Sequence, residues 1–161
     1  MESLKPDSLP SNYISANNIR VHYIRSGQGF PMVLLHGWPE FWYTWRHCIP
    51  ALARQYDVDN FMKPGNIQGG FNWYVSSATA RLLSIKEKLP PVPKIEVPSR
   101  FLWGKRDPIV KPEWSDRLQQ YFTNFMIDFV DTGHFVQYER PDVAVPEILA
   151  FFKACFLNAA R

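Results

Sequence analysis

The sequence predicts an α/β domain in which a mostly parallel sheet is flanked by helices. In the last third of the chain, strand-like and helix-like segments alternate, which is the pattern of parallel strands joined by helices. Residues 31–35 are a short, wholly apolar run, as expected of a strand covered on both faces. The 161 residues are 46% hydrophobic and 20% charged, which suffices for one packed domain.

The first elements in order are two strands and a helix. Apolar and polar residues alternate over 19–24, which predicts a half-buried strand, and the run 31–35 is the second strand. Apolar residues recur at helical spacing over 45–56, where Pro50 is tolerable only in a first turn. Residues 57–70 are turn-rich and carry no strand signal.

The later elements begin with the clearest helical pattern of the chain, over residues 71–89, which the prolines that follow it terminate. Two further strands are expected over 99–103 and 126–130, with a helix between them over 112–121. A last helix should begin near Pro141, because proline is favoured in a first helical turn.

Composition excludes several functional classes. The net charge is +3, but lysine and arginine are scattered, so no nucleic-acid partner is expected. Cys48 and Cys155 lack the spacing of a metal site, and we expect reduced thiols in a cytoplasmic protein with neither metal nor cofactor. Nothing in the sequence is long and apolar enough to be a membrane span.

An acid and a histidine follow the two late strands. Asp107 comes directly after the strand ending near Gly104, and His134 after the next strand. The carboxyl ends of parallel strands meet at one sheet edge, where such folds place their chemistry. An Asp bonded to a His makes an oriented base. By itself Asp107 could equally cap a turn, and His134 could be an ordinary loop histidine.

Four motifs in the right order resemble the epoxide hydrolases, a branch of the α/β-hydrolase fold. They are the stretch 33–46 with its His-Gly-Trp-Pro sequence, the cap-like segment 71–74, the segment 103–107 ending in Asp, and the Gly-His-Phe of 133–135. With its flanks, this resemblance covers most of the chain. It implies an α/β-hydrolase-like core with a remnant of a helical cap.

The resemblance implies a two-step reaction of a small-molecule epoxide with water, giving a vicinal diol. An Asp nucleophile attacks an epoxide carbon and forms an ester, and cap tyrosines hydrogen-bond the oxygen that leaves. A His oriented by a second acid then activates the water that hydrolyses the ester. By motif match, Asp107 is the orienting acid, His134 the base and Tyr74 a cap tyrosine. Without this context Tyr74 would be read as a core aromatic residue.

The resemblance also assigns the loop after the second strand. Trp38 stands where the family uses a backbone N–H to stabilise the oxyanion, and His36 and Pro39 shape that loop. No other histidine or tryptophan is assigned a role in the site.

The nucleophile of the family is absent. It sits in a Gly-x-Asp-x-Gly elbow between the first helix and the cap, and neither this pattern nor Gly-x-Ser-x-Gly occurs here. The resemblance to the family is interrupted between Asp57 and Phe61, where a family member would carry the elbow strand, its helix and most of the cap. Asp57 and Asp59 lie near it but lack the small neighbours that an elbow needs, so we assign no nucleophile.

The missing segment has consequences for the fold. We expect the first part of the core over residues 1–58, the cap remnant and connector over 59–92, and the second part of the core over 93–161. The absent strands would be the middle of the sheet. The strands ending near His36 and Gly104 must therefore pair directly or leave open edges.

Two readings of function follow. In one, an epoxide hydrolase is missing an internal segment from its sequence; in the other, the short chain is a catalytically inactive fragment or a binding module. A dehalogenase is a third possibility, although residues 72–74 favour epoxides because a halide leaving group needs no proton. The chain as given is expected to be inactive. The sequence leaves the particular epoxide and the oligomeric state open.

Overall fold

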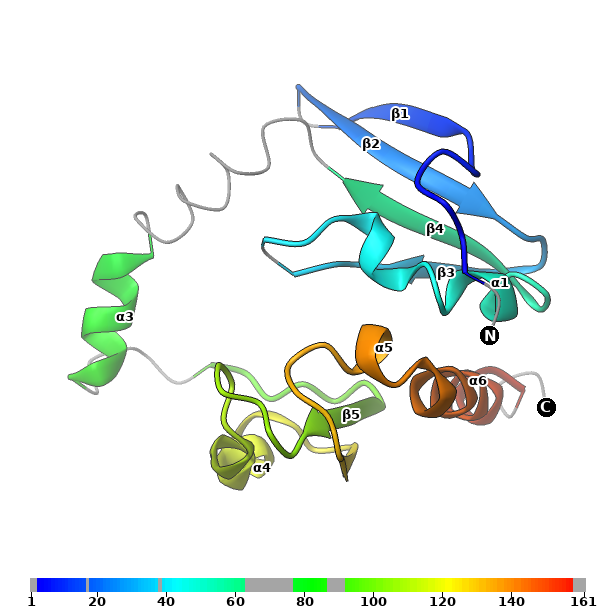
Figure 1. Cartoon of the computed structure of the whole chain (residues 1–161). Helices are drawn as coiled ribbons and strands as arrows, with labels where there is room; N and C mark the ends of the chain where they lie inside the picture. The colour runs from blue at the N-terminus through cyan, green and yellow to red at the C-terminus, as the bar shows by residue number, and fades with distance from the viewer. Residues whose placement is uncertain (1–2, 17, 38, 63–76, 87–91, 158–161) are drawn as a thin grey trace.

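The computed structural model of the chain describes residues 3–16, 18–37, 39–62, 77–86 and 92–157. Among these described residues, six strands form a four-stranded and a two-stranded sheet, and helices flank the sheets (Figure 1). The strands are β1 (Ser11–Ala16), β2 (Ile19–Ser26), β3 (Phe30–Leu34), β4 (Tyr56–Met62), β5 (Ser99–Gly104) and β6 (Phe125–Val130). The α-helices are α1 (Ile49–Leu52), α3 (Ala78–Ile85), α4 (Leu118–Tyr121), α5 (Val136–Glu139) and α6 (Pro141–Leu157), and two 3₁₀ helices are η1 (Trp42–Trp45) and η2 (Pro112–Arg117).

The N-terminal sheet has the strand order β1-β2-β4-β3. Its β1–β2 and β2–β4 pairs are antiparallel, whereas β3 and β4 run parallel. In the C-terminal sheet, β5 pairs in parallel with β6. Among the described residues, β3 pairs with β4 and not with β5, so the two strands do not pair directly.

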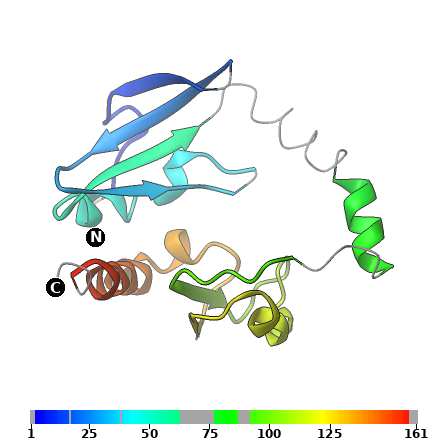
Figure 2. The ribbon, with the colours of Figure 1, turned by 180° about the vertical axis from the view of Figure 1, so that it is seen from behind.

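One face of the N-terminal sheet carries the main core. Its buried residues come from the sheet (Ile24, Met32, Leu34, Val58), from α1 and the residue before it (Cys48, Ile49, Leu52), from η1 (Trp42) and from α6 (Val145). Helices α1, α5 and α6 lie on the same side of this sheet, the side toward β5 (Figures 1 and 2). Pro50 lies in the first turn of α1, where its missing N–H costs no helical bond.

The expectation that residues 31–35 are covered on both faces was wrong. Met32 and Leu34 are buried, but Val33 between them is 54% exposed. Successive side chains of a strand point to opposite faces, and the described helices cover only one face of this sheet.

The expectation of no strand over residues 57–70 was also wrong, because β4 extends from Tyr56 to Met62. Val58 packs in the core, and Asp57 on the opposite face binds Arg25. Polar and apolar residues therefore alternate along this strand, and its aspartates made it look like a turn. β4 crosses residue 58, where the first domain boundary was placed, and the three-part division stays a prediction.

The helix expected over 45–56 is only the short α1, because residue 56 already begins β4, and β1 matches no predicted element. The later elements agree with their predicted positions. The strands expected over 99–103 and 126–130 are β5 and β6, and the helix expected over 112–121 is η2 followed by α4. Helix α6 begins at Pro141. Of the helix expected over 71–89, α3 is the part within the described residues, and it lies to one side of both sheets (Figure 2).

Candidate active site

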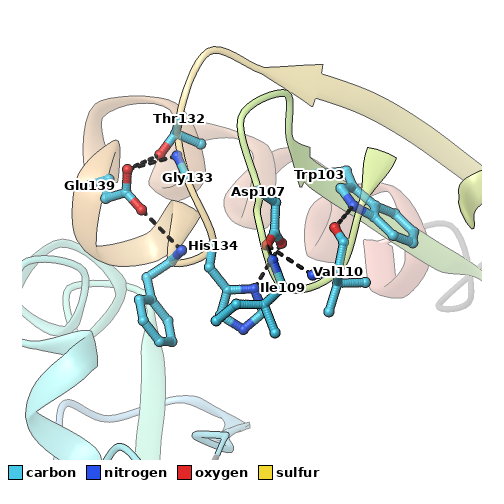
Figure 3. Close-up of polar contacts among 9 residues, drawn as sticks. Trp103, Asp107, Ile109, Val110, Thr132, Gly133, His134 and Glu139 are labelled. Carbon is cyan, nitrogen blue, oxygen red and sulfur yellow. Dashed lines mark hydrogen bonds and ion pairs between the residues drawn. The ribbon is translucent and has the colours of Figure 1, made fainter. Parts of the chain in front are cut away.

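The carboxyl ends of β5 and β6 bring two polar side chains together. β5 ends at Gly104 and β6 at Val130, and these two residues are partners in the parallel register. The loop after β5 carries Asp107 and the loop after β6 carries His134, as the sequence predicted (Figure 3). Parallel strands end at the same edge, so both loops start side by side.

Backbone contacts fix these two loops against each other. The amide of Lys105 donates to the carbonyl oxygen of Val130 at 2.8 Å, and that of Arg106 to Thr132 at 3.0 Å. A Cβ placed on Gly104 would lie 1.9 Å from the carbonyl oxygen of Gly133. Only a residue without a side chain permits this approach, so Gly104 sets how closely the loops pack.

Asp107 and His134 form a hydrogen-bonded pair. The Nδ1 atom of His134 lies 2.7 Å from Oδ2 of Asp107. The other carboxylate oxygen, Oδ1, accepts the backbone amides of Ile109 at 2.8 Å and Val110 at 2.9 Å. Each oxygen of Asp107 thus has its own partners, and the carboxylate cannot rotate without losing them.

The surroundings keep the Asp107 carboxyl ionised. Asp107 is 7% exposed, and this burial by itself would raise its pKa. The hydrogen bonds from His134 and from the amides of Val110 and Ile109 outweigh burial and hold the pKa below its ordinary value. A carboxylate accepts but does not donate, so the neutral imidazole carries its proton on Nδ1.

The free nitrogen of His134, Nε2, is therefore the basic one. The side chain is 29% exposed, and the pair borders a small pocket of about 200 Å³. Its walls are Leu102, Trp103, Gly104 and Val110 beside the two paired residues. The Trp103 indole donates to the Val110 carbonyl oxygen at 2.8 Å, which ties this wall to the Asp107 loop. An acceptor nitrogen beside a pocket can take a proton from a water molecule.

The other expected site residues are not joined to this pair in the described part of the chain. Nδ1 of His36 lies 3.0 Å from the carbonyl oxygen of Gly37. Pro39 borders a second hollow of about 420 Å³, which is rich in aromatic residues and includes Phe135, the neighbour of His134. Trp38 and Tyr74 lie outside the described residues.

Two aspartates near the discontinuity do not resemble a nucleophile. Both oxygens of Asp57 are engaged by the guanidinium group of Arg25. Asp59 lies within β4, opposite Arg25 and Val33, and burial raises the pKa of its carboxyl. Neither residue stands on a turn between a strand and a helix, and the chain runs unbroken through this strand.

Sequence reasoning missed Glu139. Its carboxylate contacts the loop that carries His134 (Figure 3). The available signal was an acid in the first turn of the helix that follows the His134 loop.

A family model described as the alpha/beta hydrolase fold matches residues 67–141. A solved epoxide hydrolase from Bacillus megaterium, in complex with an inhibitor, superposes with a TM-score of 0.67 at 16% identity, covering 88% of this chain and 100% of that chain. The chain has the α/β-hydrolase fold. A serine hydrolase involved in carbazole degradation superposes equally well, with a TM-score of 0.67, 15% identity and coverage of 91% and 99%. The α/β-hydrolase fold alone therefore does not select one chemistry.

Sequence similarity points to one branch of the α/β-hydrolases. A soluble epoxide hydrolase from Corynebacterium sp. (strain C12) is 60% identical over 42 residues, which are 26% of this chain and 15% of that protein. Bifunctional epoxide hydrolase 2 of Mus musculus is 40% identical over 50 residues, 30% of this chain and 9% of that protein. The resemblance to epoxide hydrolases is thus confirmed, although the matched segments are a small share of both relatives. No helix within the described ranges has the length and apolar character needed to cross a membrane.

Proposed function

We propose that this chain is epoxide hydrolase-like and carries the water-activating half of the two-step reaction. The observation that carries the proposal is the 2.7 Å contact between His134 Nδ1 and Asp107 Oδ2 beside a pocket, where no other described residue hydrogen-bonds Nε2 of His134. In this role His134 takes a proton from water as that water attacks an ester, and Asp107 stabilises the imidazolium that forms.

The first half of the reaction has no candidate nucleophile in this sequence. The carboxylate of Asp57 is occupied by Arg25, and no Gly-x-Asp-x-Gly elbow occurs. We therefore propose that the chain as given forms no ester with an epoxide. Tyr74 as the group that hydrogen-bonds the epoxide oxygen, and the loop of His36, Trp38 and Pro39 as the oxyanion site, belong to the same proposal.

An activated ester tests the water-activating half without the nucleophile. We expect the chain to hydrolyse p-nitrophenyl acetate, and His134→Ala to lower that rate by about 10²-fold, the contribution typical of a general base. His47→Ala is the matched control, because His47 contacts the ring of Tyr138 and has no bond to Asp107. Equal rates for wild type and His134→Ala would contradict the proposed role.

The alternative, an inactive fragment that serves as a binding module, is favoured by the missing elbow. The intact mass of the protein from its natural source separates the two. A mass of 18.8 kDa fits the chain as given, whereas a larger mass with extra residues after Asp57 identifies a complete enzyme. In a complete enzyme, the oxygen added to the epoxide in a single turnover in ¹⁸O-water should be unlabelled, because it comes from the aspartate and not from solvent.

The free thiols of Cys48 and Cys155 are compatible with a reducing compartment, and we propose the cytoplasm.

A further inference from the structure

The carboxylate of Glu139 binds the loop of His134 at three points. Glu139 is the last residue of α5, and its side chain reaches back to the residues before that helix (Figure 3). Oε2 accepts the hydroxyl of Thr132 and the amide of Gly133, both at 2.7 Å. Oε1 accepts the amide of Phe135 at 3.1 Å.

These three donors lie on both sides of His134. Gly133 precedes the histidine and Phe135 follows it, so the loop segment is bound to Glu139 before and after the residue that carries the imidazole. The ring of Phe135 contacts the imidazole edge to face, with 4.7 Å between centroids. The bond to the Phe135 amide therefore fixes a residue that packs directly against the His134 ring.

The same carboxylate is linked to the Asp107 loop. Thr132 is 1% exposed, and its carbonyl oxygen accepts the amide of Arg106, the residue before Asp107. Glu139 thus holds one of the residues that join the two loops. The Thr132 hydroxyl and the amides of Gly133 and Phe135 hold the pKa of Glu139 below its ordinary value, and the positive charge of Arg106 acts in the same direction. The carboxylate is ionised at neutral pH.

We propose that Glu139 is a positioning residue, which fixes the loop of His134 so that Nδ1 of the imidazole faces Oδ2 of Asp107. This inference deepens the proposed function and rests on it, because it assigns a purpose to the orientation of the His134 base. A role confined to stabilising the start of α5 predicts the same three hydrogen bonds, but it predicts no effect on the imidazole.

Glu139→Gln separates these roles because the two oxygens of Glu139 have different partners. The glutamine oxygen can take the place of Oε2 and keep the bonds to Thr132 and Gly133. Its amide nitrogen then faces the Phe135 amide, and two donors cannot bond to each other. We expect hydrogen exchange at the Phe135 amide to accelerate about tenfold, as the loss of one hydrogen bond implies.

The decisive measurement is the nuclear magnetic resonance signal of the His134 ring. The wild-type chain should show a protonated Nδ1 and an unprotonated Nε2 at pH 7.5. In Glu139→Gln we expect the Nδ1–H signal to broaden away and the two ring nitrogens to approach the averaged shifts of a free histidine. Glu147→Gln is the matched control, since Glu147 on α6 binds Arg100 of β5 and, among the described residues, contacts neither loop.

An unchanged His134 ring signal in a Glu139→Gln chain whose Phe135 amide exchanges faster would overturn the proposal and leave only the helix-stabilising role. If Glu139→Gln does not fold, Thr132→Val removes one of the three donors and keeps the shape of a buried side chain. It should then weaken the Nδ1–H signal in the same direction, and an unchanged signal there also contradicts the proposal. The ring signal is independent of turnover, so a failed ester assay and a failed positioning role are distinguishable.

Discussion

Replacement of Asp107 by asparagine tests the paired base most sharply, because the two oxygens of this carboxylate have separate partners. The asparagine oxygen can replace Oδ1 and keep the amides of Ile109 and Val110. The asparagine NH₂ group then takes the place of Oδ2, which in the wild type lies 2.7 Å from Nδ1 of His134 and accepts its proton. Because two donors cannot bond, the imidazole must move its proton to Nε2 or lose the contact.

The cost follows from the bond that is lost. A hydrogen bond to a charged group contributes about 1.5–3 kcal/mol, and the Asp107 side chain is only 5% exposed, so solvent screens it little. We expect Asp107→Asn to lower the free energy of unfolding by about 2 kcal/mol in urea denaturation. Ring-nitrogen spectra should show the proton on Nε2, and ester hydrolysis should fall to the rate of His134→Ala. A variant that keeps the Nδ1 proton, or that hydrolyses the ester at the wild-type rate, would refute this reasoning.

Three further predictions concern the fold around the pair. Val58→Ala should destabilise the chain by about 2 kcal/mol in thermal unfolding, since Val58 is 1% exposed, whereas Val33→Ala on the open face of β3 should cost under about 0.5 kcal/mol. Gly104→Ala should lower the free energy of unfolding by about 1–3 kcal/mol and disturb the His134 ring signal, because the added Cβ meets the carbonyl oxygen of Gly133. Gly37→Ala, where no atom lies within 4 Å of the added Cβ, should change neither. The native pKa of Asp107 lies below its unfolded value, so its contribution to the free energy of unfolding is present above about pH 4 and is lost as pH falls through the native pKa. The free energy of unfolding of Asp107→Asn should therefore depend less on pH below about pH 4.

The late half of the fold was predictable because its signals are local. β5 and β6 are apolar runs that end in glycine or an acid, and α6 begins at its proline. The same locality placed Asp107 and His134 at one sheet edge, since parallel strands fix where their loops emerge. Their contact then required only that the loops be short.

The early half was harder because its pattern depends on what covers each face. In β4 the apolar Val58 alternates with Asp57 and Asp59. The two acids suggest a turn, but Arg25 of β2 lies beside them in the sheet. Val33 was expected to be buried, but the described helices cover only one face of the N-terminal sheet, and Val33 lies on the other face. Such features depend on partners distant in sequence.

Glu139 was missed for a different reason. Its importance lies in three donors that precede it in the chain, two of which are backbone amides. Backbone donors leave no mark on a sequence, so a surface acid that binds a loop cannot be told from one that contacts only water. Only the loop geometry around His134 identifies its contacts.

The central claim is that the chain holds a water-activating pair without the nucleophile that would use it. Incubation of the chain with styrene oxide, with the diol quantified by chromatography for wild type and His134→Ala, tests this most directly. The account predicts diol formation at the uncatalysed rate for both proteins. Diol formed faster by the wild-type chain, and abolished by His134→Ala, would contradict it.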